Sequence, residues 1–315
     1  MTDEHRVLVW FSCGAASATA AKLAVEKYGA RAELLYCDTL AYEHPDNARF
    51  LRDVEGWLGR KVRILRSTKY TDIFDVFRKR RFLKGVHGAP CTTHLKKNVR
   101  EAYQRPGDIH VFGLTADEGA RIERFEARQP DLKCDFVLAE AGINKADCFR
   151  VLTAAGIELP AMYRLGYGNA NCVGCVKGGM GYWNKIRVDF PAAFQRMAQL
   201  ERELGHALLK DRRGGKSRPL YLDELDPSAG RGVPLPDIGC GVVCAEQLDL
   251  PLGASDWARS GNRYTCGATR AEVRIENGDC LIRVDGRVVG AYCESELVYA
   301  QAEAIRNWPT EQTNG

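Results

Sequence analysis

The chain has 315 residues, of which 45% are hydrophobic and 27% charged, and its net charge is +4. This is the size and composition of an ordinary soluble globular protein with room for more than one domain, and so mild a basic charge does not by itself require a nucleic-acid partner. No run of about 18 apolar residues predicts a membrane span, and the N-terminus lacks the pattern of a secretory leader. We therefore expect a cytoplasmic protein with no membrane partner.

Residues 6–118 alternate between strand and helix patterns. Apolar runs of strand length occupy 6–12, 31–39, 61–67 and 108–118, and helical patterns occupy 17–29, 43–59, 71–83 and 92–104. This alternation predicts an α/β fold with a doubly wound, mainly parallel sheet. Ligands of such sheets bind at the carboxyl ends of the strands. Three of these ends are polar or glycine-rich, and we expect them to converge on one pocket: 12–17, 38–39 and 113–124.

The pattern changes after residue 139. A helix gives way to a cysteine-rich loop, an amphipathic helix is predicted at 190–209, and the Gly/Pro-rich stretch 212–244 is predicted to be mostly loop. Two or three short strands and a helix at 295–308 then predict a small C-terminal β-β-α unit. We expect domains at 1–253 and 254–315, with the second one holding nucleic acid or making the contacts of a homo-oligomer.

The stretch "SCGAAS" follows the first predicted strand and leads into a helix. Gly14 permits close backbone approach, Ala15 adds little bulk, and the backbone N–H groups at the start of the helix attract anions. The stretch matches neither the Walker A nor the Rossmann glycine pattern. Taken alone, it indicates a structural turn and a phosphate site about equally.

Four segments in order resemble the PP-loop superfamily of adenine-nucleotide α-hydrolases (HUP type), in its phosphoadenylyl-sulfate (PAPS) reductase-like branch. They are "FSCGAAS", "LLYCDTLAYEHPDNARFLRDV", "VFGLTADEGARIERF" and "AGIELPAMYRLGYGNANCVGC", and together they span about residues 7–190. The resemblance departs from the family at Cys13, where many PP-loops have glycine, and at Thr115, where the family often has arginine.

This resemblance implies a set of nucleotide-binding residues. Phosphate would be held by Ser12, Gly14 and Ser17, and Asp38 would lie near the ribose or adenine and take part in catalysis. Arg121 and Arg124 would act as catalytic cations that neutralise phosphate or sulfate, or they are ordinary surface charges. The full set expected to contact ATP, PAPS or adenylyl sulfate (APS) is Ser12, Cys13, Gly14, Ala15, Ser17, Asp38, Thr39 and Gly113.

Twelve cysteines are many for a reducing compartment, where disulfides are rare. Cys172 and Cys175 have the spacing of two ligands to one metal centre. The resemblance adds Cys91 as a third thiolate, although Thr92 stands where a second upstream cysteine would be. Cys244 or Cys240 is the candidate fourth ligand; alternatively, the resemblance to tRNA-thiolating PP-loop enzymes implies a fourth iron site that stays open for the sulfur to be transferred. We expect a [4Fe–4S] cluster, with structural zinc or metal-free thiols as alternatives.

Three functions remain open. The first is an ATP-dependent sulfurtransferase that acts on tRNA or DNA, supplied with sulfur by a cysteine desulfurase; the basic stretches 77–85 and 210–219 favour it. The second is a PAPS or APS reductase that makes sulfite with thioredoxin and uses Cys240 as the attacking thiol. The third is a non-catalytic nucleotide- and metal-binding module.

Overall fold

The fold is described from a computed structural model, which covers residues 5–85, 88–211 and 217–230 together with the backbone of five strands between 258 and 293. The chain divides into two compact units, Met1–Glu246 and Gln247–Gly315. No helix in these described parts is long and apolar enough to cross a membrane.

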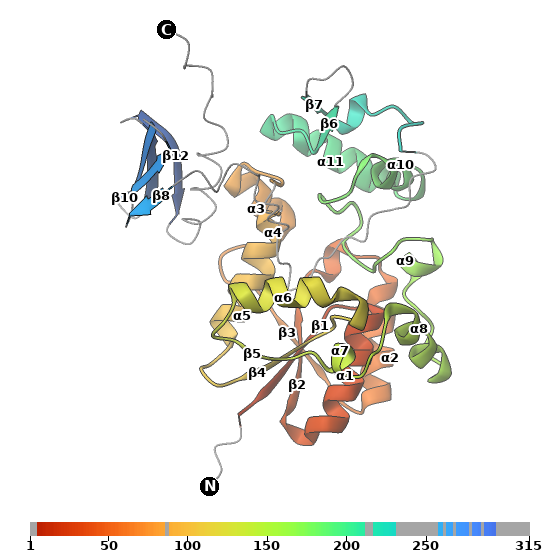
Figure 1. The fold of residues 1–315 in the computed structure, drawn as a ribbon. Helices are drawn as coiled ribbons and strands as arrows, with labels where there is room; N and C mark the ends of the chain where they lie inside the picture. Colours follow the sequence, from red (N-terminus) through yellow and green to blue (C-terminus); the bar gives the residue numbers. More distant parts are fainter. Residues whose placement is uncertain are drawn as a thin grey trace. The chain divides into compact units, whose positions relative to one another are not determined.

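A five-stranded sheet forms the centre of the first unit (Figure 1). All its strands run parallel, in the order β3-β2-β1-β4-β5. The four strands predicted from the sequence are present, whereas β5 was not predicted because three residues are too few to show a periodic pattern. The strands are β1 (Val7–Phe11), β2 (Ala32–Cys37), β3 (Val62–Leu65), β4 (Ile109–Phe112) and β5 (Lys133–Asp135).

Helices cover both faces of this sheet. Alternate residues of β1 point to opposite faces, so Val7 and Val9 join one apolar core and Leu8 and Trp10 join another. The first core includes α1 (Ala15–Tyr28), α2 (Asp46–Leu58), α7 (Val137–Glu140) and α8 (Lys145–Ala154). The second includes α5 (Asn98–Tyr103) and α6 (Gly119–Arg128). The predicted doubly wound α/β fold is confirmed.

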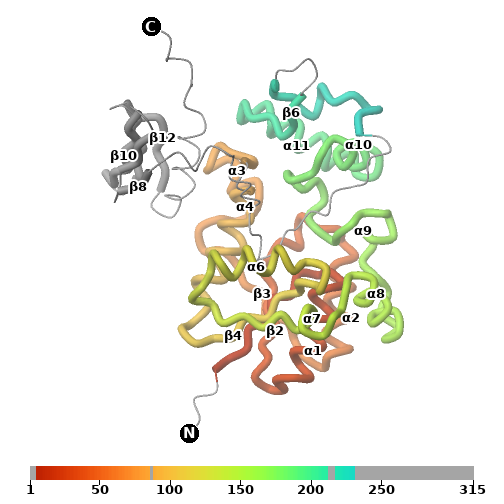
Figure 2. Tube along the Cα trace, in the orientation of Figure 1, coloured from red at the N-terminus to blue at the C-terminus, as the bar shows by residue number. Residues whose placement is uncertain are grey.

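A third apolar core joins helices that are far apart in the sequence (Figure 2). Val76 and Phe77 of α3 share it with Trp183 of α10, and an ion pair at 2.9 Å links Arg78 of α3 to Glu203 of α11. The helices of this region are α3 (Ile73–Arg80), α4 (Pro90–Thr92), a π-helix (Thr93–Lys97), α9 (Ala161–Arg164), α10 (Met180–Asp189) and α11 (Pro191–Leu204).

The predicted helix at 190–209 ends earlier than expected. Gly205 adopts a φ of +65° at the end of α11, and the next residues form a hairpin of β6 (Leu209–Asp211) with β7 (Arg218–Leu220). The sequence predicts loop at residues 218–220, because a strand of three residues with a proline gives no periodic signal. The buried carboxylate of Glu201 accepts the backbone N–H of Leu222 at 2.7 Å and so secures the chain after the hairpin.

The second unit contains a five-stranded antiparallel sheet in the order β12-β11-β10-β9-β8. The sequence predicted only two or three strands here, and the predicted helix at 295–308 lies outside the described residues. The strands are β8 (Ala258–Ser260), β9 (Arg263–Cys266), β10 (Thr269–Glu276), β11 (Asp279–Val284) and β12 (Arg287–Cys293).

Candidate functional site

The carboxyl ends of β1, β2 and β4 bring the predicted nucleotide residues to one edge of the sheet. β1 lies between β2 and β4, so the loop 12–17 has the loop after β2 on one side and Gly113 on the other. The chain leaves β1 for β2 on one side and reaches β4 on the other, which makes this edge the switch point of the strand order. Ligands of open α/β sheets bind at such a point.

The loop after β1 folds around the hydroxyl of Ser17. Ser17 Oγ accepts the backbone N–H of Ser12 at 3.1 Å and that of Gly14 at 3.3 Å, and it donates to the Gly14 carbonyl at 2.9 Å. The N–H groups of the loop thus point inward at the start of α1, where the helix dipole adds positive potential. An anion that accepted these N–H groups would take the place of the Ser17 oxygen.

Cys13 keeps the backbone shape of a glycine but sends its thiol into the core. Its φ is +55°, in the left-handed region that favours glycine. Its side chain is fully buried, and the thiol donates to the backbone carbonyl of Asn47 on α2 at 3.8 Å. Burial raises the pKa of this thiol well above its ordinary value. Only the backbone of Cys13 therefore faces the expected nucleotide pocket.

Gly113 packs directly against the first turn of α1. A Cβ placed on Gly113 would lie 2.7 Å from both Cα and N of Ser17, closer than side-chain carbons approach backbone. The absence of a side chain thus lets the end of β4 meet the loop 12–17. The role of Gly113 that the structure shows is this close backbone contact with Ser17.

Tyr163 is a site residue that sequence reasoning missed. Its hydroxyl oxygen accepts the backbone N–H of Ala15, the first residue of α1, at 3.3 Å, and its ring packs edge-on against Phe149 of α8. It therefore lies over the helix start where phosphate was predicted. The sequence carries a weak signal in the stretch "LPAMYRLGYG", but nothing local shows which tyrosine reaches α1.

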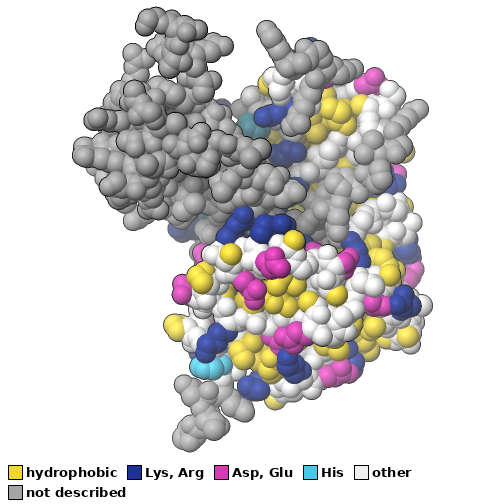
Figure 3. All heavy atoms as spheres, in the orientation of Figure 1, with side chains coloured by type: hydrophobic (Ala, Val, Ile, Leu, Met, Phe, Trp, Pro, Cys, Tyr) yellow, Lys and Arg dark blue, Asp and Glu magenta, His cyan; other side chains and the backbone are white. Residues whose placement is uncertain are grey.

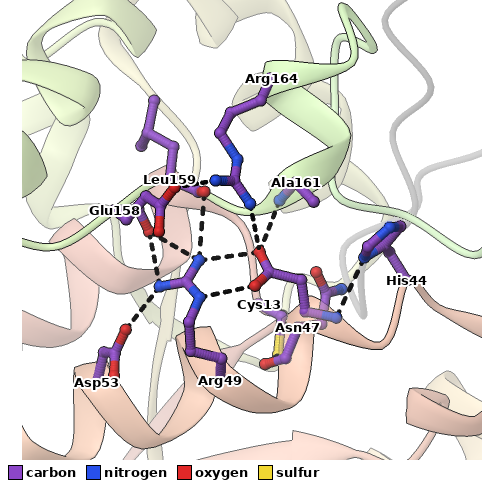
Figure 4. A network of polar contacts seen from close by, with 10 residues as sticks. Cys13, His44, Asn47, Arg49, Asp53, Glu158, Leu159, Ala161 and Arg164 are labelled. Carbon is purple, nitrogen blue, oxygen red and sulfur yellow. Dashed lines mark hydrogen bonds and ion pairs between the residues drawn. The ribbon is translucent and has the colours of Figure 1, made fainter.

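An ionic network holds the segment that carries Tyr163 (Figure 4). Arg49 of α2 donates to both carboxylate oxygens of Asp46, at 2.7 and 2.9 Å, and to the carbonyl of Glu158 at 3.1 Å. Asp46 also accepts the backbone N–H of Ala161 at 2.8 Å. These contacts lower the pKa of Asp46 to about 2. The start of α9 is thereby fixed to α2 at Ala161, two residues before Tyr163.

The two polar residues after β2 differ in their surroundings. Asp38 is partly exposed and pairs with Arg66, at the end of β3, at 2.8 Å. Thr39 is buried and donates to the carboxylate of Glu43 at 2.7 Å. The Thr39 side chain thus stabilises the inner side of the loop between β2 and α2. Asp38 remains accessible for the predicted contact with ribose or adenine.

Glu43 is a buried carboxylate that sequence reasoning did not single out. It accepts from Thr39 and, at 2.7 Å, from Asn47 Nδ2. Burial raises its pKa, and the nearby ammonium of Lys96 opposes this effect. Lys96 is itself buried in the π-helix, a helix type that is frequent at functional sites. The loop between β2 and α2 therefore rests on a buried polar cluster.

The segment after β4 uses its polar residues for local structure. Thr115 caps the following turn, donating to Glu118 through its backbone N–H and its hydroxyl at 3.0 and 3.1 Å. Arg121 forms an ion pair with the same glutamate, and Arg124 is exposed on α6. Basic and acidic side chains also lie side by side on the face drawn in Figure 3. Arg121 is thus held by Glu118 rather than by the loop 12–17.

The Cys172–Cys175 loop is tied to the same edge of the sheet. The backbone N–H of Val173 donates to the carbonyl of Tyr42, after β2, at 2.8 Å. The Tyr182 hydroxyl accepts the N–H of Cys175 at 2.9 Å, and burial beside the Cys175 and Cys172 thiols raises its pKa. The Tyr182 hydroxyl also donates to the backbone carbonyl of Cys172 at 3.4 Å, so one side chain contacts the backbone of both cysteines.

The described residues do not form a complete version of the predicted metal site. Cys91 packs against the apolar core that contains Cys175. Among residues 5–85, 88–211 and 217–230, however, no three His, Cys, Asp or Glu side chains are placed to hold one metal ion. The remaining candidates, Cys240 and Cys244, lie outside the described residues. The described residues therefore do not complete a ligand set, and a metal held by Cys172 and Cys175 stays a prediction.

Comparison with known proteins does not assign this chain to a family. No family model matches the chain, and no curated protein matches its sequence.

Proposed function

We propose that the loop 12–17 binds the phosphate of an adenine nucleotide at the switch point of the sheet. The observation that carries this proposal is the set of backbone N–H groups at the start of α1: those of Ser12 and Gly14 converge on the Ser17 hydroxyl, and that of Ala15 donates to the Tyr163 hydroxyl. Protein hydroxyls accept these N–H groups, at positions suited to phosphate oxygens. Asp38 is the candidate contact to the ribose or adenine, and the resemblance to PP-loop proteins favours adenine over other bases.

The reaction that we propose is an ATP-dependent sulfur transfer to tRNA or DNA in the cytoplasm. An oxygen of the nucleic acid attacks the α-phosphorus of ATP, and pyrophosphate leaves. The persulfide sulfur supplied by a cysteine desulfurase then attacks the activated carbon and displaces AMP, which departs with that oxygen, and a dithiol reductant cleaves the remaining S–S bond and is oxidised to a disulfide. Phosphate held at the start of α1 would be oriented for the first step by the loop amides, and their positive potential would stabilise its developing charge.

Cys172 and Cys175 would hold two positions of an iron–sulfur cluster or of zinc, with Cys91 as a further candidate. A bound cluster would supply a site that carries the transferred sulfur. Fully buried thiols such as those of Cys37 and Cys148, both in the sheet cores, agree with a reducing compartment.

The alternative reaction is the reduction of PAPS or APS to sulfite with thioredoxin. The resemblance of the closing segment "AGIELPAMYRLGYGNANCVGC" favours it. Its candidate attacking thiol, Cys240, lies outside the described residues. A non-catalytic nucleotide- and metal-binding module is the third candidate, because the described loop carries no acidic residue of its own.

One preparation separates these functions. The protein is purified without oxygen, its iron and zinc are measured, and ATP and PAPS binding are followed by calorimetry. We expect ATP binding and a release of AMP that depends on added tRNA or DNA. Sulfite release from PAPS would establish the reductase instead, and binding without turnover of either nucleotide would establish the module. A protein that binds no adenine nucleotide would contradict the proposal.

A further inference from the structure

A hollow of about 330 Å³ lies at the carboxyl end of β3, outside the predicted nucleotide site. One side of it is the segment 65–70, which follows β3, and the other side is formed by residues of the π-helix and α5. This volume falls at the lower end of the range of small-molecule sites and matches a group of roughly mononucleotide size.

The walls of the hollow combine rings with polar groups. The rings of Tyr70 and His94 lie 4.7 Å apart at an interplanar angle of 37°. Asn98 contacts His94 Nδ1 at 3.4 Å and adds an amide to the same wall. The segment is held in a turn by Ser67, whose hydroxyl oxygen accepts the backbone N–H of Lys69 and of Tyr70 at 3.2 Å each. Tyr70 therefore lies in a turn that is stabilised by these hydrogen bonds.

The charge of the lining is positive. Arg66 and Lys69 line the hollow, and none of the described residues that line it is acidic. Arg66 is largely exposed and forms an ion pair with Asp38 at 2.8 Å. Lys69 is also exposed. Rings, an amide and cations in one hollow are the groups that recognise a base together with a phosphate.

We propose that this hollow binds one unstacked nucleotide of the nucleic acid that accepts sulfur. Its base would stack on Tyr70, and its phosphate would meet Lys69. The proposal rests on the proposed function, because it assigns a place to the acceptor of that reaction. β3 is two strands from β1, which is about 10 Å across the sheet. A nucleotide here would therefore lie within its own length of the phosphate held at the loop 12–17.

The test measures the binding of labelled single-stranded RNA and DNA 12-mers by fluorescence anisotropy at several salt concentrations. Tyr70→Ala is expected to weaken binding roughly 5- to 150-fold through lost stacking, and Tyr70→Phe is expected to bind like the wild type. Lys69→Gln is expected to lower the salt slope by about 0.7, the loss of one phosphate contact. Lys61→Gln, at the opposite end of β3, is the matched control and keeps the wild-type slope.

ATP binding is measured on the same variants and separates the two proposals. Unchanged ATP binding with weakened oligonucleotide binding supports the hollow as the acceptor site. Wild-type oligonucleotide binding by both Tyr70→Ala and Lys69→Gln overturns it, even when ATP binds. Oligonucleotide binding that depends on Tyr70 in a protein that binds no ATP would keep the hollow and contradict the proposed function. Displacement of the 12-mer by free nucleoside monophosphate at equal concentration assigns the hollow to free nucleotides and overturns the acceptor site.

Discussion

The thiol of Cys13 lies 3.8 Å from the backbone carbonyl oxygen of Asn47, under the loop that follows β1. This contact joins the loop to α2 and takes the side chain of Cys13 away from the edge where a nucleotide would bind. The residue at position 13 is therefore selected by two demands, a left-handed backbone and a small buried side chain. Glycine satisfies the first demand and cysteine the second.

Substitutions at Cys13 should separate these demands. Cys13→Gly relieves about 1–2 kcal/mol of left-handed strain. It loses a similar amount because the unfolded chain gains entropy and the buried thiol is removed. The unfolding free energy of this variant should therefore stay within about 1 kcal/mol of the wild type. Cys13→Val should cost about 2–3 kcal/mol, because a β-branched side chain is strained at this φ. Urea unfolding measures both, and equal stability of the two variants would contradict the strain.

Gly113→Ala should weaken nucleotide binding at least tenfold, because the new Cβ would lie 2.7 Å from the backbone of Ser17 and push the end of β4 away from the loop 12–17. Gly119→Ala is the matched control, since a Cβ there meets nothing within 4 Å. Alanine also favours the helix α6 by up to about 1 kcal/mol. Calorimetry with ATP and thermal unfolding test the pair, and equal affinity of both variants would remove Gly113 from the site.

Asp46→Asn should release the start of α9 from α2. The pKa of Asp46 is lowered to about 2, so the ionised carboxylate contributes stability above its ordinary pKa of 3.8, and this is lost as the pH falls toward 2. The side chain is partly exposed, so we expect a loss of about 1–2 kcal/mol at pH 7. Hydrogen exchange should accelerate at 158–164. Unchanged exchange there would show that the network does not position Tyr163.

His110 should make the protein sensitive to acid. It is buried on β4, its Nδ1 accepts the N–H of Trp10 at 3.0 Å, and burial lowers its pKa to about 4. Between pH 6.5 and 4 the unfolded chain binds a proton that the folded chain does not, so stability falls as the pH drops, by up to about 3 kcal/mol. His110→Asn keeps an acceptor for Trp10 without titrating, so in urea titrations its stability relative to the wild type should rise as the pH falls from 6.5 to 4.

Glu201 should have the opposite effect on stability. Burial raises its pKa to about 7, so between pH 4.5 and 7 the folded chain binds a proton that the unfolded chain does not, and stability falls as the pH rises. Glu201→Gln resembles the protonated acid and should remove this contribution, so that the stability of the variant falls as the pH drops through the effect of His110 alone. The wild type should then show a nearly flat profile between pH 4.5 and 6.5, where the effects of His110 and Glu201 oppose each other. A steep wild-type profile in that range would contradict one of the two pKa directions.

The alternation of apolar runs and helical patterns in residues 6–118 was sufficient to predict the doubly wound sheet. Periodicity is a local property, and each strand of four residues or more carries it along its own length. β5 and the β6–β7 hairpin were missed because they have three residues each and depend on pairing with distant strands. The small-residue loop 12–17 could also be predicted from the sequence, because side-chain bulk and backbone flexibility are properties of the individual residues.

The sequence by itself determined the class of fold and the small-residue loop after β1, and it placed Cys172 and Cys175 at a Cys-x-x-Cys spacing. Only the tertiary structure decided that the Cys13 thiol is buried, that Gly113 meets Ser17 and that Tyr163 covers the start of α1. The reason is that side-chain direction and contacts between distant segments come from how sheet, helices and loops pack together. No spacing along the chain encodes the approach of two segments 148 positions apart, such as Ala15 and Tyr163.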